Sequence, residues 1–285
     1  MAGLAQLGQV YLDGQSHFKS FSKAPTQTTA SGIWFDLSMS AGNPVAQYYI
    51  GAAYAATALA RSADHGLNHG PDAPAGFSKY LSKLDIATAA LAASVNTFEL
   101  LDYLLFYPFI AMDAGVAEMV NVTTLPRYTD GRGVQIMAVE TNSYVGSATF
   151  QVTYTNQDGV PGRVTPVLTC NTQISTGTVA TSATATVGCC GRFLTLQAGD
   201  YGVRSIESIE FFTPDVGLLT LVLVKPLAYC NIFENTAANF FDLLRDFKLL
   251  PQIESDAYLN FICLPTGTLA GAQLQGNITT IWVED

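Results

Sequence analysis

The chain has 285 residues, of which 49% are hydrophobic and only 13% are charged. This length and composition exclude a disordered tail and a disulfide-dependent miniprotein, because the chain is long enough to bury one or two sizeable cores. With 13 Lys and Arg against 23 Asp and Glu, the net charge of −10 also disfavours direct binding to DNA or RNA, which needs clustered cations.

Residues 1–30 predict an extended arm. Isolated apolar side chains alternate irregularly with Gly, Ser, Gln and Thr, without a sustained period. Such an arm is too sticky for a solvated linker, so we expect it to lie against its own body or a neighbouring molecule. The candidate interface residues of the arm are Leu7, Tyr11, Phe18 and Phe21.

The region after the arm predicts short elements. Residues 33–37 are typical of a first strand, and residues 47–50 of a second short strand. Residues 51–63 are rich in Ala and have helical propensity. The Gly, Pro, Asn and His residues of 65–76 end any regular element.

The most apolar part of the chain allows two interpretations. Residues 82–93 are rich in helix formers, whereas residues 98–110 are dense in large apolar side chains. For the second stretch we predict a strand, because residues 100–107 have no clean helical period and Pro108 would break a helix. We expect residues 116–125 to continue as strand.

This apolar part does not predict a membrane span. Glu99, Asp102 and Asp113 interrupt it, and Pro108 breaks it, so no run of about 20 apolar residues exists. The start of the chain lacks the cationic and apolar regions of a secretory signal. We therefore expect synthesis and folding in a cytosol and no membrane partner.

The next hundred residues carry the strongest structural signal. Short alternating runs are separated by Gly-rich and Pro-rich turns, and the segment 156–159 is typical of a hairpin turn. Residues 164–191 contain no charged side chain, so we expect them to be shielded from solvent or held in a sheet. The predicted strands cover 133–139, 148–154, 163–165, 191–196, 203–212 and 218–224.

The C-terminal part predicts one helix over 239–250, stopped by Pro251, and strands over 257–263 and 277–283. Together the elements predict an all-β protein, a jelly-roll-like β-sandwich with an extended N-terminal arm and one or two short helices. We expect the body, residues 31–285, to form one sandwich or two packed sub-sandwiches with a boundary near 115–130.

Catalytic motifs are absent from the sequence. It contains no phosphate-binding loop, dinucleotide fingerprint, nucleophile elbow, H-E-x-x-H or C-x-x-C. The most tempting cluster is 64–72, where His65 and His69 could share a face only on a helix, and Gly66 and Gly70 argue against one. We predict a polar surface loop there, with a metal site or a hydrolase acting through these histidines as alternatives.

Two carboxylate pairs lie on predicted strands. Glu99 with Asp102, and Glu207 with Glu210, face opposite sides of a strand, so we expect solvent-facing or edge-guarding charges rather than a catalytic pair. We thus predict no catalytic, cofactor-binding or metal-binding residue, no cofactor and no enzyme activity.

The five cysteines are irregularly spaced and form no metal-ligand pattern. We expect them to be small buried apolar side chains, with a disulfide between Cys170 and Cys189 as the alternative.

A sticky arm, a hydroxyl-rich β body and few charges are typical of an assembly subunit whose surface is covered by copies or partners. Three segments, 125–135, 196–205 and 256–261, resemble stretches of tailed-bacteriophage virion proteins. The resemblance implies a structural role in a virion. The predicted all-β fold differs from the mixed α/β fold usual for the major shell protein of tailed phages. This difference favours an auxiliary protein of the particle.

The resulting hypothesis is a capsid decoration protein or minor head protein. We expect it to bind copies of itself, with a trimer as a suitable arrangement, and the major capsid protein, through its arm and sandwich edges. The alternative is a receptor-binding or glycan-binding module of a tail or fibre, which would use exposed Tyr or Trp side chains.

Overall fold

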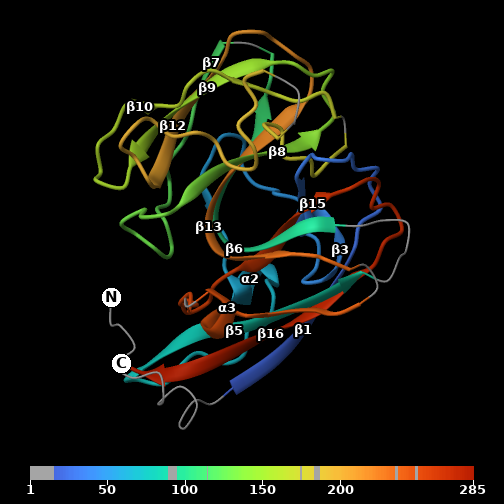
Figure 1. The fold of residues 1–285 in the computed structure, drawn as a ribbon. Coiled ribbons are helices and arrows are strands. Elements are labelled where there is room, and N and C mark those ends of the chain that lie inside the picture. The colour runs from blue at the N-terminus through green and yellow to red at the C-terminus, as the bar shows by residue number, and fades with distance from the viewer. Residues whose placement is uncertain are drawn as a thin grey trace.

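The computed structural model describes residues 16–88, 95–113, 115–173, 175–182, 187–234, 237–247 and 250–285. In these residues the chain is almost entirely β, and its named strands form three antiparallel sheets in a jelly-roll-like sandwich arrangement (Figure 1). This confirms the predicted fold class. The helical elements are short, and they are the 3-10 turn η1 (Leu37–Met39), α2 (Arg61–Asp64) and α3 (Leu243–Phe247). None of the helices in the described ranges has the length and apolar character needed to cross a bilayer.

The outer sheet lies at the bottom of Figure 1 and has five strands. Their spatial order is β14 (Asn239–Asp242), β5 (Phe77–Thr88), β16 (Leu274–Glu284), β1 (Ser16–Ala24) and β3 (Ala41–Asn43). The second half of the predicted arm is therefore β1, an extended strand that pairs with β16 and β3 of its own body.

The central sheet lies next to it and contains the longest strands of the described chain. Its order is β2 (Phe35–Asp36), β15 (Leu259–Pro265), β6 (Val95–Ala111), β13 (Leu218–Asn231) and β8 (Gln135–Asn142), and β4 (Thr57–Ala58) also pairs with β6. The upper sheet, at the top of Figure 1, contains β10 (Arg163–Val164), β9 (Thr149–Asn156), β12 (Val203–Phe211) and β7 (Gly115–Glu118), and β11 (Leu168–Thr169) pairs with β9.

Two hydrophobic cores share the central sheet. The lower core lies between the outer sheet and the first half of β6, and it contains Phe98 and Leu100. The upper core lies between the upper sheet and the second half of β6, and it contains Leu105 and Tyr107. We refer to the two halves of the molecule as the lower and upper sandwiches. They meet within single strands rather than at a linker.

Burial on both faces explains the apolar run in β6. Leu101, Tyr103 and Phe106 belong to a third cluster on the opposite face of the central sheet, where the 34–59 segment covers it. A strand buried on both faces shows no polar alternation. The prediction of a strand rather than a helix for 98–110 is confirmed.

The predicted helix over 239–250 was wrong in its first half. Residues 239–242 pair with β5 as strand β14, and the helix α3 begins only at Leu243. The side chain of Asp242 accepts a hydrogen bond from the backbone N–H of Arg245 at 3.0 Å, which starts the helix after the strand. An open strand edge and this capping bond outweigh the helical spacing of the apolar residues.

Two predicted strands are absent from the described chain. Residues 47–50 are irregular, because Tyr49 has a positive φ of 53° and its buried hydroxyl bonds to Asp36. Residues 191–196 touch β8 through a single backbone bond from Leu194 to Ile136 and form no strand. At 47–50 a side-chain anchor, rather than a strand ladder, fixes the chain, and at 191–196 one backbone bond to β8 is too little to make a strand.

Other elements are shorter than predicted or of the other type. The helix-forming stretch 82–93 begins as strand β5, because its long register with β16 outweighs local propensity. The predicted strand 33–37 is limited to β2, the helical propensity of 51–63 yields only α2, and the strand predicted over 116–125 ends at Glu118.

Candidate binding face on the outer sheet

The face of the outer sheet that points away from the lower core carries side chains in rows that cross four strands. The strand register defines the rows, because residues paired across neighbouring strands point to the same side of a sheet. The first row is Phe18, Thr279, Lys83 and Asp242, and the second row is Ser20, Asn277, Asp85 and Phe240. We call these eight residues the outer face.

Two phenylalanines stand at opposite ends of the outer face. The side chain of Phe18 is 65% exposed and that of Phe240 is 72% exposed. They lie three strand spacings apart, about 14 Å at the usual spacing of neighbouring strands. Both line a hollow of about 510 Å³. A second hollow of about 440 Å³ continues along the sheet past Ser22 and Gln275.

The floor between the two rings is polar, its cation Lys83 lies beside a carboxylate, and its second carboxylate, Asp85, bonds to an amide. The Asn277 side-chain amide donates a hydrogen bond to Asp85 at 2.7 Å. The ammonium of Lys83 lies 3.9 Å from the Asp242 carboxylate. At the rim, the Arg245 guanidinium lies 2.7 Å from Asp246 and holds the pKa of that carboxyl below its usual value. The face therefore offers donors and acceptors without a large excess of charge.

The structure divides the predicted arm residues. Leu7 and Tyr11 lie outside the described residues. Phe18 is exposed on the outer face, as an interface residue would be. Phe21 points to the other side of β1 and is buried in the lower core, where its ring centroid lies 4.3 Å from that of Phe261. Phe18 and Phe21 are three residues apart on one strand, so their side chains point to opposite faces of the sheet. A partner can therefore reach Phe18 but not Phe21.

Sequence reasoning missed most of the outer face. Phe240 was assigned to the apolar side of a helix, and Asp85 to a stretch with helix-forming composition. The alternation of Asn277, Ile278 and Thr279 is the signal that could have shown which side of β16 faces solvent. What brings Asn277 beside Asp85 is the pairing of strands nearly two hundred residues apart, which a single sequence does not reveal.

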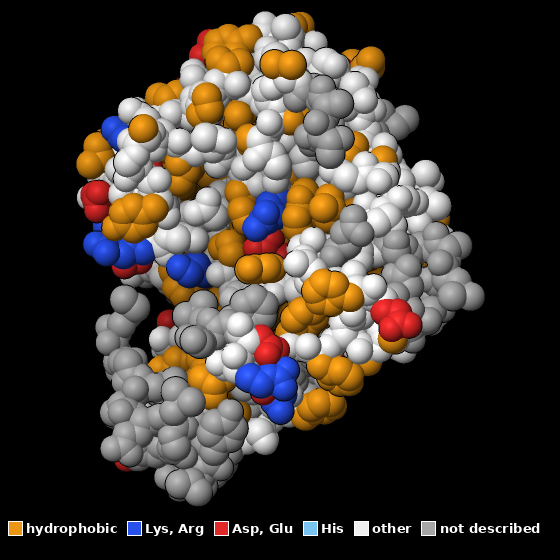
Figure 2. Space-filling model, in the orientation of Figure 1, with side chains coloured by type: hydrophobic (Ala, Val, Ile, Leu, Met, Phe, Trp, Pro, Cys, Tyr) orange, Lys and Arg blue, Asp and Glu red, His pale blue; other side chains and the backbone are white. Residues whose placement is uncertain are grey.

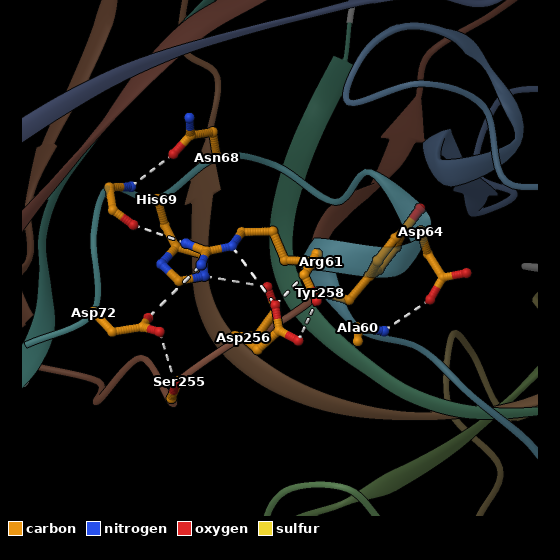
Figure 3. Close-up of polar contacts among 12 residues, drawn as sticks. Ala60, Arg61, Asp64, Asn68, His69, Asp72, Ser255, Asp256 and Tyr258 are labelled. Atoms are coloured by element: carbon orange, nitrogen blue, oxygen red, sulfur yellow. Dashed lines mark hydrogen bonds and ion pairs between the residues drawn. The ribbon is translucent and has the colours of Figure 1, made fainter.

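The cluster around His65 and His69 folds as a brace between α2, β5 and the segment before β15 (Figure 3). Arg61 lies between Asp72 and Asp256, 3.8 Å from each carboxylate, and donates a hydrogen bond to the carbonyl of Gly70 at 2.7 Å. Ser255 donates to Asp72 at 2.8 Å. The interpretation as a simple surface loop was incomplete, because Leu67, His69 and Gly70 are buried.

His69 is a buried polar side chain of that loop. Its Nδ1 accepts a hydrogen bond from the ammonium of Lys79 at 2.9 Å. Its Nε2 donates to the carbonyl oxygen of Ala257 at 3.2 Å, since a carbonyl only accepts. Burial lowers the pKa of His69 to about 3, and the Lys79 charge acts in the same direction. Both ring nitrogens are engaged and the ring stays neutral, while His65 is exposed, so the two histidines do not form one centre.

The carboxylates predicted to face solvent on β6 are buried instead. Asp102 is fully buried and accepts two hydrogen bonds from the guanidinium of Arg127, at 2.7 and 2.9 Å. Glu99 forms an ion pair with Arg192, whose guanidinium also lies over the ring of Trp34. Because β6 is covered on both faces, neither side of it was open to solvent, and each acid needs a cation.

The described residues contain no group of three His, Cys, Asp or Glu side chains that could hold a metal ion. Cys170, Cys230 and Cys263 are buried. Burial raises the pKa of the Cys230 thiol to about 12.

The upper sandwich exposes apolar side chains of another kind. Ten of the nineteen large apolar side chains exposed on the described chain lie between 116 and 216, and eight of these ten are valines. Two of them meet at one carboxylate: the backbone N–H groups of Val145 and Val216 both donate to Asp215, at 3.0 and 2.7 Å. Figure 2 shows apolar side chains spread over the top of this view and charged groups confined to a few clusters.

Comparison with known proteins assigns no family. No protein-family model and no curated protein matches the chain. Among solved structures, the crystal structure of the infectious bursal disease virus VP2 subviral particle aligns over 93% of this chain at 9% sequence identity, with a TM-score of 0.09. This chain spans 64% of that chain, less than two thirds of its length. So low a score carries no information about fold or role.

Proposed function

We propose that this protein is a non-catalytic structural component of a tailed-bacteriophage particle, a capsid decoration protein or minor head protein. The observation that carries the proposal is the set of eight exposed valines on the upper sandwich. Exposed apolar side chains gathered on one region of a surface are typical of protein contacts. A valine has one stiff side-chain torsion, so ordering it in an interface costs little entropy.

The partners in this proposal are copies of the chain and the major capsid protein. Two features support a protein partner over a nucleic acid. The net charge is −10, and the charged fraction of 13% is about half that of ordinary soluble domains, so much of the surface is hydroxyl or apolar. Such a surface is covered by another protein at low desolvation cost. The resemblance of segments 125–135, 196–205 and 256–261 to virion proteins supports the particle as the location.

The test is the composition of purified particles. We expect the chain in a fixed stoichiometric ratio to the major capsid protein when particle proteins are quantified by mass spectrometry. Replacing Val145 and Val216 by Ser should lower its incorporation, whereas Val45→Ser, a matched exposed valine outside the upper sandwich, should not. Particles that form normally and lack the chain would overturn the proposal.

A further inference from the structure

The two exposed phenylalanines of the outer face need a partner of a particular shape. A phenyl ring left in water forfeits most of its apolar burial, and the outer face holds two such rings, at Phe18 and Phe240. They are separated by a polar floor rather than joined in one apolar patch. A protein partner would meet that floor as a desolvation cost. A ligand with apolar faces and a polar edge would match both parts.

The floor offers hydrogen-bonding groups of both kinds. Asn277 and Asp85 are locked to each other by a 2.7 Å hydrogen bond, which fixes the orientation of the amide and the carboxylate before any ligand arrives. The hydroxyl of Thr279 stands beside them in the neighbouring row. Carboxylates accept, amides do both, and hydroxyls do both, as the hydroxyl groups of a sugar also do.

The charges of the outer face indicate a neutral ligand. Lys83 is paired with Asp242, and Arg245 with Asp246. An anionic ligand would have to compete with these carboxylates for the two cations. A cationic ligand would be attracted by Asp85, whose carboxylate accepts from the Asn277 amide, but it would also meet both cations at the edge of the hollow. A ligand that carries only hydroxyl and ether oxygens neither competes with these carboxylates nor is repelled by the cations.

The size of the hollows matches a short chain of sugar rings. The first hollow, of about 510 Å³, lies within the range of small-molecule sites, about 300 to 1,000 Å³. The second continues along the sheet, so the trough is longer than one ring. The strands of Phe18 and Phe240 lie three strand spacings apart, about 14 Å across the sheet, which leaves room for further rings over the floor.

From this geometry we infer that the outer face is a binding site for a neutral saccharide, which stacks on Phe18 and Phe240 and hydrogen-bonds to Asn277, Asp85 and Thr279. The inference is independent of the proposed role in a particle, which is carried by the upper sandwich. A chain that fails to assemble into particles could still bind the saccharide, and the reverse also holds.

The experiment uses the purified full chain on an array of neutral and acidic glycans, followed by calorimetric titration with the best neutral oligosaccharide. We expect Phe18→Ala and Phe240→Ala each to weaken binding about tenfold or more, since each removes one stacking ring. Phe18→Tyr, which keeps the ring, should retain binding. Phe212→Ala, an exposed phenylalanine of the upper sandwich, is the matched control and should bind like the parent protein.

Circular dichroism and thermal unfolding of every variant show that the loss is not a folding defect. The inference is overturned if no neutral glycan binds or if binding survives both Phe18→Ala and Phe240→Ala. It is also overturned if only acidic glycans bind and Lys83→Gln abolishes that binding. A dimer seen by light scattering that Phe18→Ala and Phe240→Ala dissociate, without any glycan binding, would assign the outer face to a second copy of the chain instead.

Discussion

The upper and lower sandwiches are built on the same two long strands, yet they present different surfaces. Between 116 and 216 the exposed large apolar side chains are mostly valines, whereas seven of the nine exposed elsewhere are aromatic. The apolar excess of the sequence therefore appears on the surface as two kinds of side chain, aliphatic in one region and aromatic elsewhere. Aliphatic side chains on the upper sandwich suit a protein partner, and separated aromatic rings over a polar floor suit a saccharide.

The interiors of the two sandwiches also differ, because one buries an acidic side chain and the other a basic one. The upper sandwich holds Glu140, a buried acid of β8 whose carboxyl oxygens accept no hydrogen bond of normal geometry within the described residues. The lower sandwich holds Lys23, a buried base of β1 that donates to two backbone carbonyls, of Ser40 at 3.1 Å and of Pro44 at 2.7 Å. Two carbonyls offset the cost of burying Lys23, whereas the cost of burying Glu140 is offset only in part, by the backbone N–H of Tyr144.

The largest effect is expected at the joint between the sandwiches. Arg127 pairs with Asp102 of β6 and also donates to the carbonyls of Leu59 and Tyr103, at 3.1 and 3.0 Å. Arg127→Ala leaves a fully buried carboxylate without its cation, so we expect the free energy of unfolding to fall by about 3–5 kcal/mol. Urea denaturation measures this change.

The matched control is Arg132→Ala, which removes an exposed pair with Asp130. It should cost at most about 1 kcal/mol. Equal losses of stability in Arg127→Ala and Arg132→Ala would show that the buried pair does not hold the two sandwiches together.

The next prediction tests whether the two sandwiches unfold as one cooperative unit. Leu100 and Leu105 are fully buried on the same strand, one in the lower core and one in the upper core. We expect Leu100→Ala and Leu105→Ala each to cost about 2–5 kcal/mol and to shift a single unfolding transition. Fluorescence and circular dichroism followed together in one denaturation series detect this. Two separate transitions, each moved by one variant only, would show that the sandwiches fold independently.

A pH titration distinguishes the two buried groups. Burial raises the pKa of Glu140 to about 8, partly offset by the backbone N–H of Tyr144. Between pH 4.5 and about 8 the folded chain keeps a proton that the unfolded chain has lost, so stability falls as pH rises. One proton contributes at most about 1.4 kcal/mol per pH unit to this slope.

In Glu140→Gln this contribution disappears, because the amide does not titrate. Denaturation at several pH values, with the variant compared with the parent at each, isolates the contribution from those of other groups. An unchanged slope between pH 4.5 and 8 contradicts the assignment of this effect to Glu140.

Lys23 predicts the opposite slope in the next pH range. Burial lowers its pKa to about 7, and the negative charge of Asp36 opposes that shift. Between about pH 7 and 10.5 the unfolded chain holds a proton that the folded chain has released, so stability rises with pH. Lys23→Met should remove this rise, in the same comparison against the parent protein. A variant whose stability still climbs with pH as the parent's does refutes the role of Lys23.

Much of the fold was predictable from the sequence, and the reasons are local. Strands β8, β9, β12, β13 and β16 follow alternating or continuously apolar runs bounded by Gly and Pro, and the hairpin turn at 156–159 joins β9 to β10 as predicted. The errors arise where a distant partner decides. Residues 239–242 became a strand because β5 offered an open edge, and Asp102 became buried because Arg127 reached it.

The outer face shows the same limit at the level of a site. The exposure of Phe18 was expected from its place in the arm, and that of Phe240 was not. Each row of the outer face draws residues from four strands that span the whole chain, from Ser20 to Asn277. Alternation shows which residues of one strand share a side, but the register between strands depends on side-chain packing across the whole sheet.

The smallest effect compares two asparagines that each bond to an aspartate. In the upper sandwich, buried Asn156 donates to Asp200 at 2.8 Å and accepts from the backbone N–H groups of Asp158 and Val160 in the hairpin turn. In the lower sandwich, Asn277 makes one side-chain bond, to Asp85, on an open face. Asn156→Ala leaves several buried groups unpaired and should cost about 1–3 kcal/mol.

Asn277→Ala should cost less than about 1 kcal/mol, because water can replace the lost hydrogen bond. The difference matters for function. A polar row that contributes little to stability is free to be used by a ligand, whereas one that braces a turn is not. Thermal unfolding of the two variants side by side measures it, and a cost at Asn277 as large as that at Asn156 would make the outer row a structural brace and remove the reason to regard it as a site.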